Sequence, residues 1–475
     1  MQLQGEDLTR IAGGIELRAW CSMPPDGGFV RVFRDARSVA DLNLGGLLIR
    51  KRLAALLQKS PLLKHVLTLL SGNLLSQVIQ LGLMVFVTRI YPVDDRGLFA
   101  VYGSITTLVI SVAAFRYDLA IVLPKSETLA RIVHRLARRN IMVSAALCSI
   151  VCFALSQWFE QQYHSTALTR WLWFSGFTVF LVAEMTNIQF WLTRVSRFAD
   201  IAMNRVIQTL TVAGLQLILA LVFGPSVSML LIAALAGQLI TLVLLEFRVK
   251  ELWKPIPRPS YPVRYAAKLY WRMPAFNGPN VLVDGIRNTG ISLLIASHAI
   301  VALGQFDVAW VSMQMPVALL AGSISQVFLK KLSTVKPGAM VPLVRFTVTR
   351  GLAFAIIPFA LIYLLSPWMF PFVFGEQYAG AGIFAQALVP WLMMTVVTSP
   401  ISNVFVVTNT QHWMLVFAVA YCVAPLLWLW KSPLPLTQTI FGLGLIMAAF
   451  LAVMLVMSFF AAARFDRSKR IDETA

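Results

Sequence analysis

The sequence is poor in charged side chains, which make up 13% of its 475 residues. Soluble globular domains usually contain about 25%. Hydrophobic residues account for 58% of the chain, and the mean hydropathy is +0.74. The chain is therefore too apolar for a soluble globular protein, and its composition predicts a polytopic membrane protein.

Motifs of enzymatic chemistry are also missing. The sequence contains no GxxxxGK[ST] phosphate loop and no HExxH, and its 5 histidines and 21 acidic residues form no dense cluster. These absences argue against ATP-driven transport by this chain alone and against metal-dependent hydrolysis. We therefore expect no enzyme, no cofactor and no metal, and energy from a proton or sodium gradient or from a partner. Membrane-bound glycosyl transfer or ligation stays open, although the short outer loops argue against it.

The long hydrophobic runs determine the expected fold class. A helix needs about 20 apolar residues to cross a bilayer. Runs of this kind lie near residues 66–87, 98–119, 140–158, 171–193, 206–223, 226–246, 274–297, 305–329, 346–370, 381–407, 413–430 and 437–462. Transmembrane β-strands would alternate polar and apolar residues instead. The sequence thus predicts an all-α polytopic membrane protein with about twelve transmembrane helices.

Lysine and arginine are concentrated in every second connection between these runs. Odd connections such as VFGPSV and SHAIVALG have none, whereas the second connection contains Lys125, Arg131, Arg135, Arg138 and Arg139. By the positive-inside rule, both termini are expected on the cytoplasmic side, and an even number of spans follows.

Charge and proline content predict five segments. These are a poorly ordered cytoplasmic amino-terminal extension (1–60), a first six-helix bundle (61–247), a basic Pro-rich cytoplasmic linker (248–272), a second six-helix bundle (273–463) and a cytoplasmic tail (464–475). RGLFAVYGSI around Gly97 resembles LGQFDVAWVS around Gly304. Two similar halves in the same orientation are typical of a parallel-repeat transporter, whose substrate site lies between the halves.

Polar residues inside the apolar runs are candidates for a transport site, because they are costly in lipid. Two runs carry them on one side, at helical spacing. In the first run these residues are Asn73, Gln77 and Gln80, and in the seventh they are Asn277, Asn280, Asp284 and Arg287. The alternative for the seventh run is a buried ion pair, Asp284 with Arg287, that only fixes helix packing.

The fourth run has a similar pattern, with Glu184 and Asn187 in the same relative positions. Glu184 either contributes to a site or is held protonated, or hydrogen-bonded, between helices. Arg89 and Arg116 lie at the ends of the first two runs. Each is either a site residue or a side chain that extends to the membrane interface.

Several stretches in order resemble the bacterial polysaccharide transporter family, which includes O-antigen and exopolysaccharide flippases. The resemblance is carried by SGNLLSQ, TRIYPVDDRGLFAVYGSI, RYDLAIVLP, LYWRMPAFNGPN, SMQMPVALLAGSISQVF and FVFGEQYAGAGIFAQALVP, and it spans residues 65 to about 460. It implies two six-helix bundles around a central cavity, as in the wider multidrug, oligosaccharidyl-lipid and polysaccharide exporter superfamily. The implied function is flipping of oligosaccharides linked to polyprenyl pyrophosphate, for lipopolysaccharide or exopolysaccharide synthesis.

Together these observations predict a substrate-binding site without catalytic or metal residues. We expect Arg287, Arg116 and Arg89 to attract the pyrophosphate, the Asn and Gln stripes to bind sugar hydroxyls, and Asp284 and Glu184 to balance arginines or take up a coupling proton. Membrane lipids, a polysaccharide polymerase and a chain-length regulator are the expected partners, and nucleic acid is not. The alternatives are a cation-coupled drug or small-molecule exporter of the same superfamily, and a scaffold or ligase in polysaccharide assembly.

Overall fold

The computed structural model describes residues 61–474, apart from 256–261, 333–334, 336–337 and 409. The chain divides into two units, Met1–Lys64 and His65–Ala475. The predicted extension at residues 1–60 lies outside the described residues. The second unit is described below by itself.

The described residues form helices joined by short connections, and they contain no β-strand. The long helices are α4 (Pro61–Ile90), α5 (Val93–Val112), α7 (Glu127–Ala154), α10 (Ser175–Arg194), α11 (Phe198–Phe223), α12 (Val227–Arg248), α14 (Gly278–His298), α15 (Ile300–Leu332), α16 (Met340–Phe374), α17 (Ala379–Ile401), α19 (Gln411–Lys431) and α20 (Leu436–Thr474). Each overlaps one of the apolar runs of the sequence. The predicted all-α class is confirmed.

Short helices lie between them. These are α6 (Tyr117–Ala120), α8 (Ser156–Tyr163), α9 (Thr166–Leu172), η2 (Lys250–Trp253), α13 (Val263–Leu269), the π-helix η3 (Met273–Asn277), η4 (Glu376–Tyr378) and α18 (Asn403–Val407). The described part of the predicted linker contains the short helices η2 and α13, and η3 follows directly after it. The bounds of the five predicted segments stay predictions.

Seven helices in the described part are long and apolar enough to cross a membrane, and the pair α9 and α10, bent by 50°, would make eight. The protein is thus a multi-pass membrane protein, and the count of twelve spans stays a prediction. Helices α5 and α14 are outside this set because charged and amide residues lower their hydropathy. Both lie next to the cavity described below.

The two halves of the chain repeat the same packing relations. In the first half α10 packs on α5, α7 and α12, and α12 packs on α11; in the second, α17 packs on α15, α16 and α20, and α20 packs on α19. A methyl group on Gly176 would lie 2.0 Å from the Ala145 carbonyl oxygen, and one on Gly382 would lie 2.5 Å from that of Ser366. Backbone therefore meets backbone at the same crossing in both halves, which supports an internal duplication.

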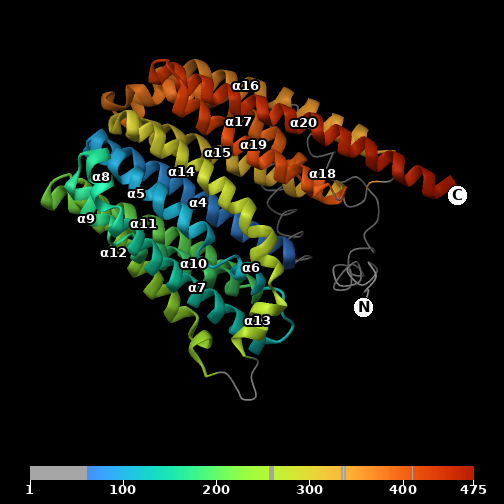
Figure 1. Cartoon of the computed structure of the whole chain (residues 1–475), viewed down its shortest axis with the longest axis horizontal. Helices are drawn as coiled ribbons and strands as arrows, with labels where there is room; N and C mark the ends of the chain where they lie inside the picture. The colour runs from blue at the N-terminus through green and yellow to red at the C-terminus, as the bar shows by residue number, and fades with distance from the viewer. Residues whose placement is uncertain (1–60, 256–261, 333–334, 336–337, 409, 475) are drawn as a thin grey trace, which may run out of the picture. The chain divides into compact units, whose positions relative to one another are not determined.

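Helix α5 joins the halves, since it packs against both α14 and α15. Figure 1 shows the blue α5 running beside the yellow α14. Polar residues on these three helices can therefore meet between the halves.

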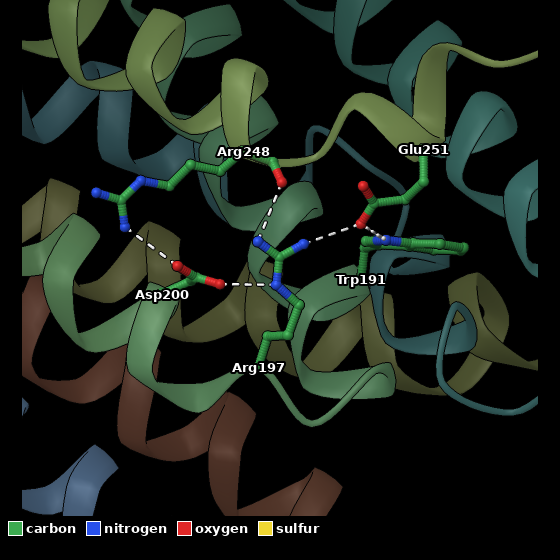
Figure 2. A network of polar contacts seen from close by, with 5 residues as sticks. All are labelled: Trp191, Arg197, Asp200, Arg248 and Glu251. Atoms are coloured by element: carbon green, nitrogen blue, oxygen red, sulfur yellow. Dashed lines mark hydrogen bonds and ion pairs between the residues drawn. The ribbon is translucent and has the colours of Figure 1, made fainter.

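A network of charged side chains ties together the helix ends of the first half (Figure 2). Arg197 Nε donates to Asp200 Oδ2 at 2.7 Å and Arg197 Nη1 donates to Glu251 Oε1 at 3.1 Å. Arg248 Nη1 donates to Asp200 Oδ1 at 3.1 Å, and Trp191 Nε1 donates to Glu251 Oε1 at 3.3 Å. These contacts hold the end of α10, the start of α11, the end of α12 and η2 as one group.

Candidate functional site

A cavity of about 600 Å³ lies among helices α4, α5, α11, α12, α14 and α15. This is within the usual size range of ligand pockets, about 300–1,000 Å³. Amide side chains give it much of its polar surface: Gln80, Gln208, Gln216, Gln238 and Asn288. The hydroxyl groups are those of Ser104, Thr107, Thr209, Thr289 and Ser292. The cavity is therefore polar but mostly neutral.

The charged groups of the lining form one ion pair between the halves. Arg96 of α5 donates from Nη2 to Asp307 Oδ2 of α15 at 3.0 Å, and their side chains are 9% and 25% exposed. The Arg96 guanidinium also lies 5.8 Å from the centre of the Phe99 ring. Asp307 and Arg96 are the only charged residues among the described lining residues, so the lining has no net formal charge.

The backbones of α5 and α15 touch next to this ion pair. A methyl group on Gly97 would lie 2.2 Å from the carbonyl oxygen of Ile300, and one on Gly304 would lie 2.3 Å from that of Val93. These are the two glycines whose surroundings resemble each other in sequence. The structure brings the two similar segments into direct contact, where no larger side chain fits.

Side chains from loops and helix ends also join the two halves near the contact of α5 with α15, and they close the cavity at this end. Arg89 of α4 donates to the carbonyl oxygens of Val373 at 3.1 Å and Phe372 at 2.7 Å, at the end of α16. Gln377 Nε2 donates to the carbonyl oxygens of Thr88 at 2.7 Å and Tyr91 at 3.3 Å. This end of the two halves is therefore held shut by hydrogen bonds as well as by packing.

Tyr91, in the connection from α4 to α5, extends this closure to α11. Burial, with a smaller contribution from the Asp95 charge, raises the pKa of the Tyr91 phenol to about 12. The hydroxyl group stays protonated at neutral pH and donates to the Gln216 carbonyl oxygen at 2.8 Å.

Aromatic rings form one wall of the cavity. Phe306 and Trp310 line it, with their ring centres 5.4 Å apart. Behind them, Trp391 stacks on Trp310 at 4.7 Å and donates from Nε1 to the Tyr421 hydroxyl at 2.7 Å. The second layer fixes Trp310 in place, which gives the cavity a rigid apolar face.

Of the predicted stripe on the first helix, the structure places Gln80 in the cavity wall. Gln77 does not line the cavity, and its Oε1 is buried without a hydrogen-bond partner among the described residues. The side chain of Asn73 lies outside the described residues. Their role in substrate binding stays a prediction.

The predicted residues of α14 lie beside the cavity rather than in its wall. Arg287 Nη1 pairs with Asp284 Oδ1 at 3.0 Å, its guanidinium lies 4.4 Å from the centre of the Tyr421 ring, and its Nη2 donates to Asn288 Oδ1 at 3.3 Å. Asn288 lines the cavity. Asn277, Asn280 and Asp284 are exposed, whereas the Arg287 side chain is 11% exposed. Arg287 therefore lies between an exposed polar helix face and the cavity.

Glu184 and Asn187 lie inside the first half, between α10, α7 and α12. Glu184 Oε1 is 3.7 Å from both His134 Nε2 and Arg138 Nε, and Asn187 Nδ2 donates to Glu184 Oε2 at 3.2 Å. Arg138 also pairs with Glu246 at 3.5 Å. This buried cluster is separate from the cavity lining, so the predicted site is split between two places.

The remaining predicted cations also lie away from the cavity wall. Arg89 closes one end, as described above. Arg116 has a left-handed backbone with φ 59° between α5 and α6, and its Nε is buried without a partner among the described residues.

Sequence reasoning missed most of the lining. Gln208 and Gln216 lie two turns apart in one apolar run, a signal of the same kind as the stripe in the first run. The lining also contains Arg96, which was not expected as a site residue, paired with Asp307. Nothing in their local sequence indicates that the two would pair, because 211 positions separate them.

Solved structures with the same fold are transporters. The chain is similar to a structure described as the lipid II flippase MurJ in an inward closed conformation, with 12% identity, a TM-score of 0.61, and 82% of this chain and 88% of that chain covered. It is also similar to an inward-facing multidrug resistance MATE transporter of the MOP superfamily (12% identity, TM-score 0.57, 84% and 99% covered). A third is the Vibrio cholerae MATE transporter VcmN with the D35N substitution (14% identity, TM-score 0.54, 85% and 96% covered). No curated protein sequence matches the chain.

The chain shares the fold of these solved structures. The profile of the family described as "Polysaccharide biosynthesis protein" matches residues 86–382. The chain belongs to this family, and the predicted relationship to polysaccharide flippases is confirmed.

Proposed function

We propose that the protein is a flippase for oligosaccharide repeat units linked to polyprenyl pyrophosphate, acting in the synthesis of a surface polysaccharide such as lipopolysaccharide or exopolysaccharide. The observation that carries this proposal is the cavity between the halves, whose wall offers amides, hydroxyls and an aromatic face. Such groups match the hydroxyls and the apolar ring faces of sugars. Membership in the polysaccharide biosynthesis family supports the same substrate class.

The position of the closed end fits an inward-facing state. With both termini cytoplasmic in a bacterial inner membrane, the contacts of Gly97, Gly304, Arg89 and Gln377 lie on the outer side. The exposed polar face at the start of α14 then lies on the cytoplasmic side, where the substrate enters. Alternating access requires these outer contacts to break while the cytoplasmic end closes.

Arg287 is well placed for the pyrophosphate. Its guanidinium is adjacent to the cavity through Asn288, and its Nε has no hydrogen-bond partner among the described residues. Guanidinium groups bind phosphate oxygens through charge-assisted hydrogen bonds. In our account the sugar occupies the cavity, the pyrophosphate lies at Arg287 and the prenyl chain stays in the lipid. Asp284 balances the Arg287 charge before the substrate arrives.

The Glu184 cluster is our candidate for ion coupling. It contains Arg138, two carboxylates (Glu184 and Glu246) and His134. With neutral histidine the cluster has one more negative than positive charge, so one added proton makes it neutral. A proton bound there would alter the packing of α7, α10 and α12, the last of which carries the cavity residue Gln238. Sodium coupling is the other candidate, and a polymerase and a chain-length regulator are the proposed protein partners.

The alternative of a cation-coupled drug exporter has less support from the cavity. An exporter of cationic drugs needs a carboxylate that is free to pair with the drug. Asp307 is the one acidic residue of the described lining, and Arg96 already occupies it.

The test is made in cells deleted for this gene, by determining which leaflet holds the lipid-linked oligosaccharide. Wild-type protein should restore the outer-leaflet pool, and Arg287→Ala should not, because the pyrophosphate loses its cation. The variant should still fold, since the Asp284 side chain is 60% exposed and stays hydrated without its partner. Arg170→Ala, an exposed arginine on α9, is the matched control and should export normally. Normal export by Arg287→Ala at equal membrane levels would overturn the assigned role of Arg287.

A further inference from the structure

The cavity has no free charge to offer to a charged sugar. Its two charged lining residues, Arg96 and Asp307, are 3.0 Å apart and neutralise each other. A carboxylate entering this space would lose its hydration and find no unpaired cation in the described lining. A cationic sugar would likewise find no unpaired anion.

The free polar groups of the lining include Arg96 Nε, whose charge Asp307 balances, and several neutral amides. Within the described residues, the side chains of Gln80, Gln208, Gln216 and Gln238 have no hydrogen-bond partner, and Gln238 Oε1 is buried. Each amide combines two N–H donors with a carbonyl acceptor. The buried Gln238 Oε1 is costly while it stays unpaired, and the four amides together favour a ligand that itself presents both donors and acceptors.

The aromatic wall favours a ligand with an apolar face. Trp310 is held by its stack on Trp391 and by the neighbouring Phe306 ring. A sugar ring has hydroxyls around its edge and C–H groups on its faces, so it can bind the amides and pack on this wall together. Acetamido groups fit as well, since they also pair a donor with an acceptor.

We infer that the oligosaccharide carried in this cavity is uncharged, built from sugars with hydroxyl and acetamido groups, and that repeat units with uronic or other acidic sugars are excluded. The inference rests on the proposed flippase function and narrows its substrate class. The pyrophosphate does not conflict with it, because Arg287 lies outside the cavity lining.

The experiment uses two bacterial tester strains that lack their own flippase. One assembles a neutral lipid-linked repeat unit, and the other assembles a repeat unit that contains a uronic acid. Wild-type protein should restore surface polysaccharide at least tenfold better in the neutral strain. Gln238→Leu, similar in size but without the amide, should reduce that export. Gln208→Arg places an unpaired cation in the lining and should raise export of the acidic unit.

Gln161→Arg on the exposed face of α8 is the matched control, and it should leave both strains as with wild type. Equal export of both units by wild type, or preference for the acidic unit, would overturn the inference while the flippase function stands. An unchanged preference in Gln208→Arg at wild-type membrane levels would also count against it. Export of neither unit would instead contradict the flippase function itself.

Discussion

Arg96 and Asp307 are the pair of side chains with the strongest electrostatic interaction in the cavity wall. They come from different halves of the chain and meet at 3.0 Å with little exposure. Breaking a fully buried pair by removing one partner usually costs about 3–5 kcal/mol, because the other charge stays buried and unpaired. Separating the halves at this point therefore requires both ions to regain water or to gain other partners, which makes this pair a barrier to accidental opening.

Asp307→Asn should lower the free energy of unfolding by about 2 kcal/mol, less than for a fully buried pair because Asp307 is 25% exposed. Thermal unfolding of the purified protein in lipid nanodiscs, followed by tryptophan fluorescence, measures the effect. The single charge reversals Arg96→Asp and Asp307→Arg should each lower the free energy of unfolding, and the double variant should lose less than their sum, since the charges again pair. A loss equal to that sum would show that the two residues do not interact.

Polar residues in the apolar runs could be predicted as functional from their cost in lipid, but the direction of each side chain could not. Gln80 and Gln77 belong to the same stripe, yet only Gln80 lines the cavity. Glu184 lies on the buried side of α10 that faces α7, where His134 and Arg138 surround it. Helical periodicity separates a polar face from an apolar one, but it does not distinguish a face that packs on a neighbouring helix from one that meets a cavity.

Helices α5 and α15 meet backbone to backbone across the two halves. The apolar runs predicted all the long helices of the described part, because bilayer length and hydrophobicity are local properties. Their crossing depends on the meeting of Gly97 with Ile300 and of Gly304 with Val93, which is a long-range property. The similarity of the two glycine segments was a usable signal for the duplication, but it did not indicate that the segments touch.

Gly97→Ala and Gly304→Ala should each push the first turns of α5 and α15 apart. The added methyl group would meet backbone oxygen at 2.2 Å or 2.3 Å, and overpacking of this kind costs about 1–3 kcal/mol. Spin labels at the exposed positions Asp94 and Val301 should therefore report a longer distance in both variants. Gly103→Ala, on the same helix with nothing within 4 Å, is the matched control. An unchanged distance in both variants would contradict the close crossing.

For the whole molecule, the account joins a repeated helical architecture to a single neutral cavity. The two halves use the same packing relations and meet through α5, α14 and α15. The contacts of Gly97 and Gly304 then lie at one end of the cavity, and Arg287 lies beside the cavity toward the other. In the proposed function, the cavity composition sets which sugars fit, and the position of Arg287 sets where the pyrophosphate lies.

The most direct test of this account is translocation by the purified protein alone. Proteoliposomes are prepared with a neutral oligosaccharide on undecaprenyl pyrophosphate, and a glycosidase that cannot cross the membrane reports its arrival at the outer leaflet. The account predicts movement across the bilayer in vesicles with wild-type protein under a proton or sodium gradient, and none in protein-free vesicles. Equal accessibility over time in the two kinds of vesicle, under both gradients, would contradict it.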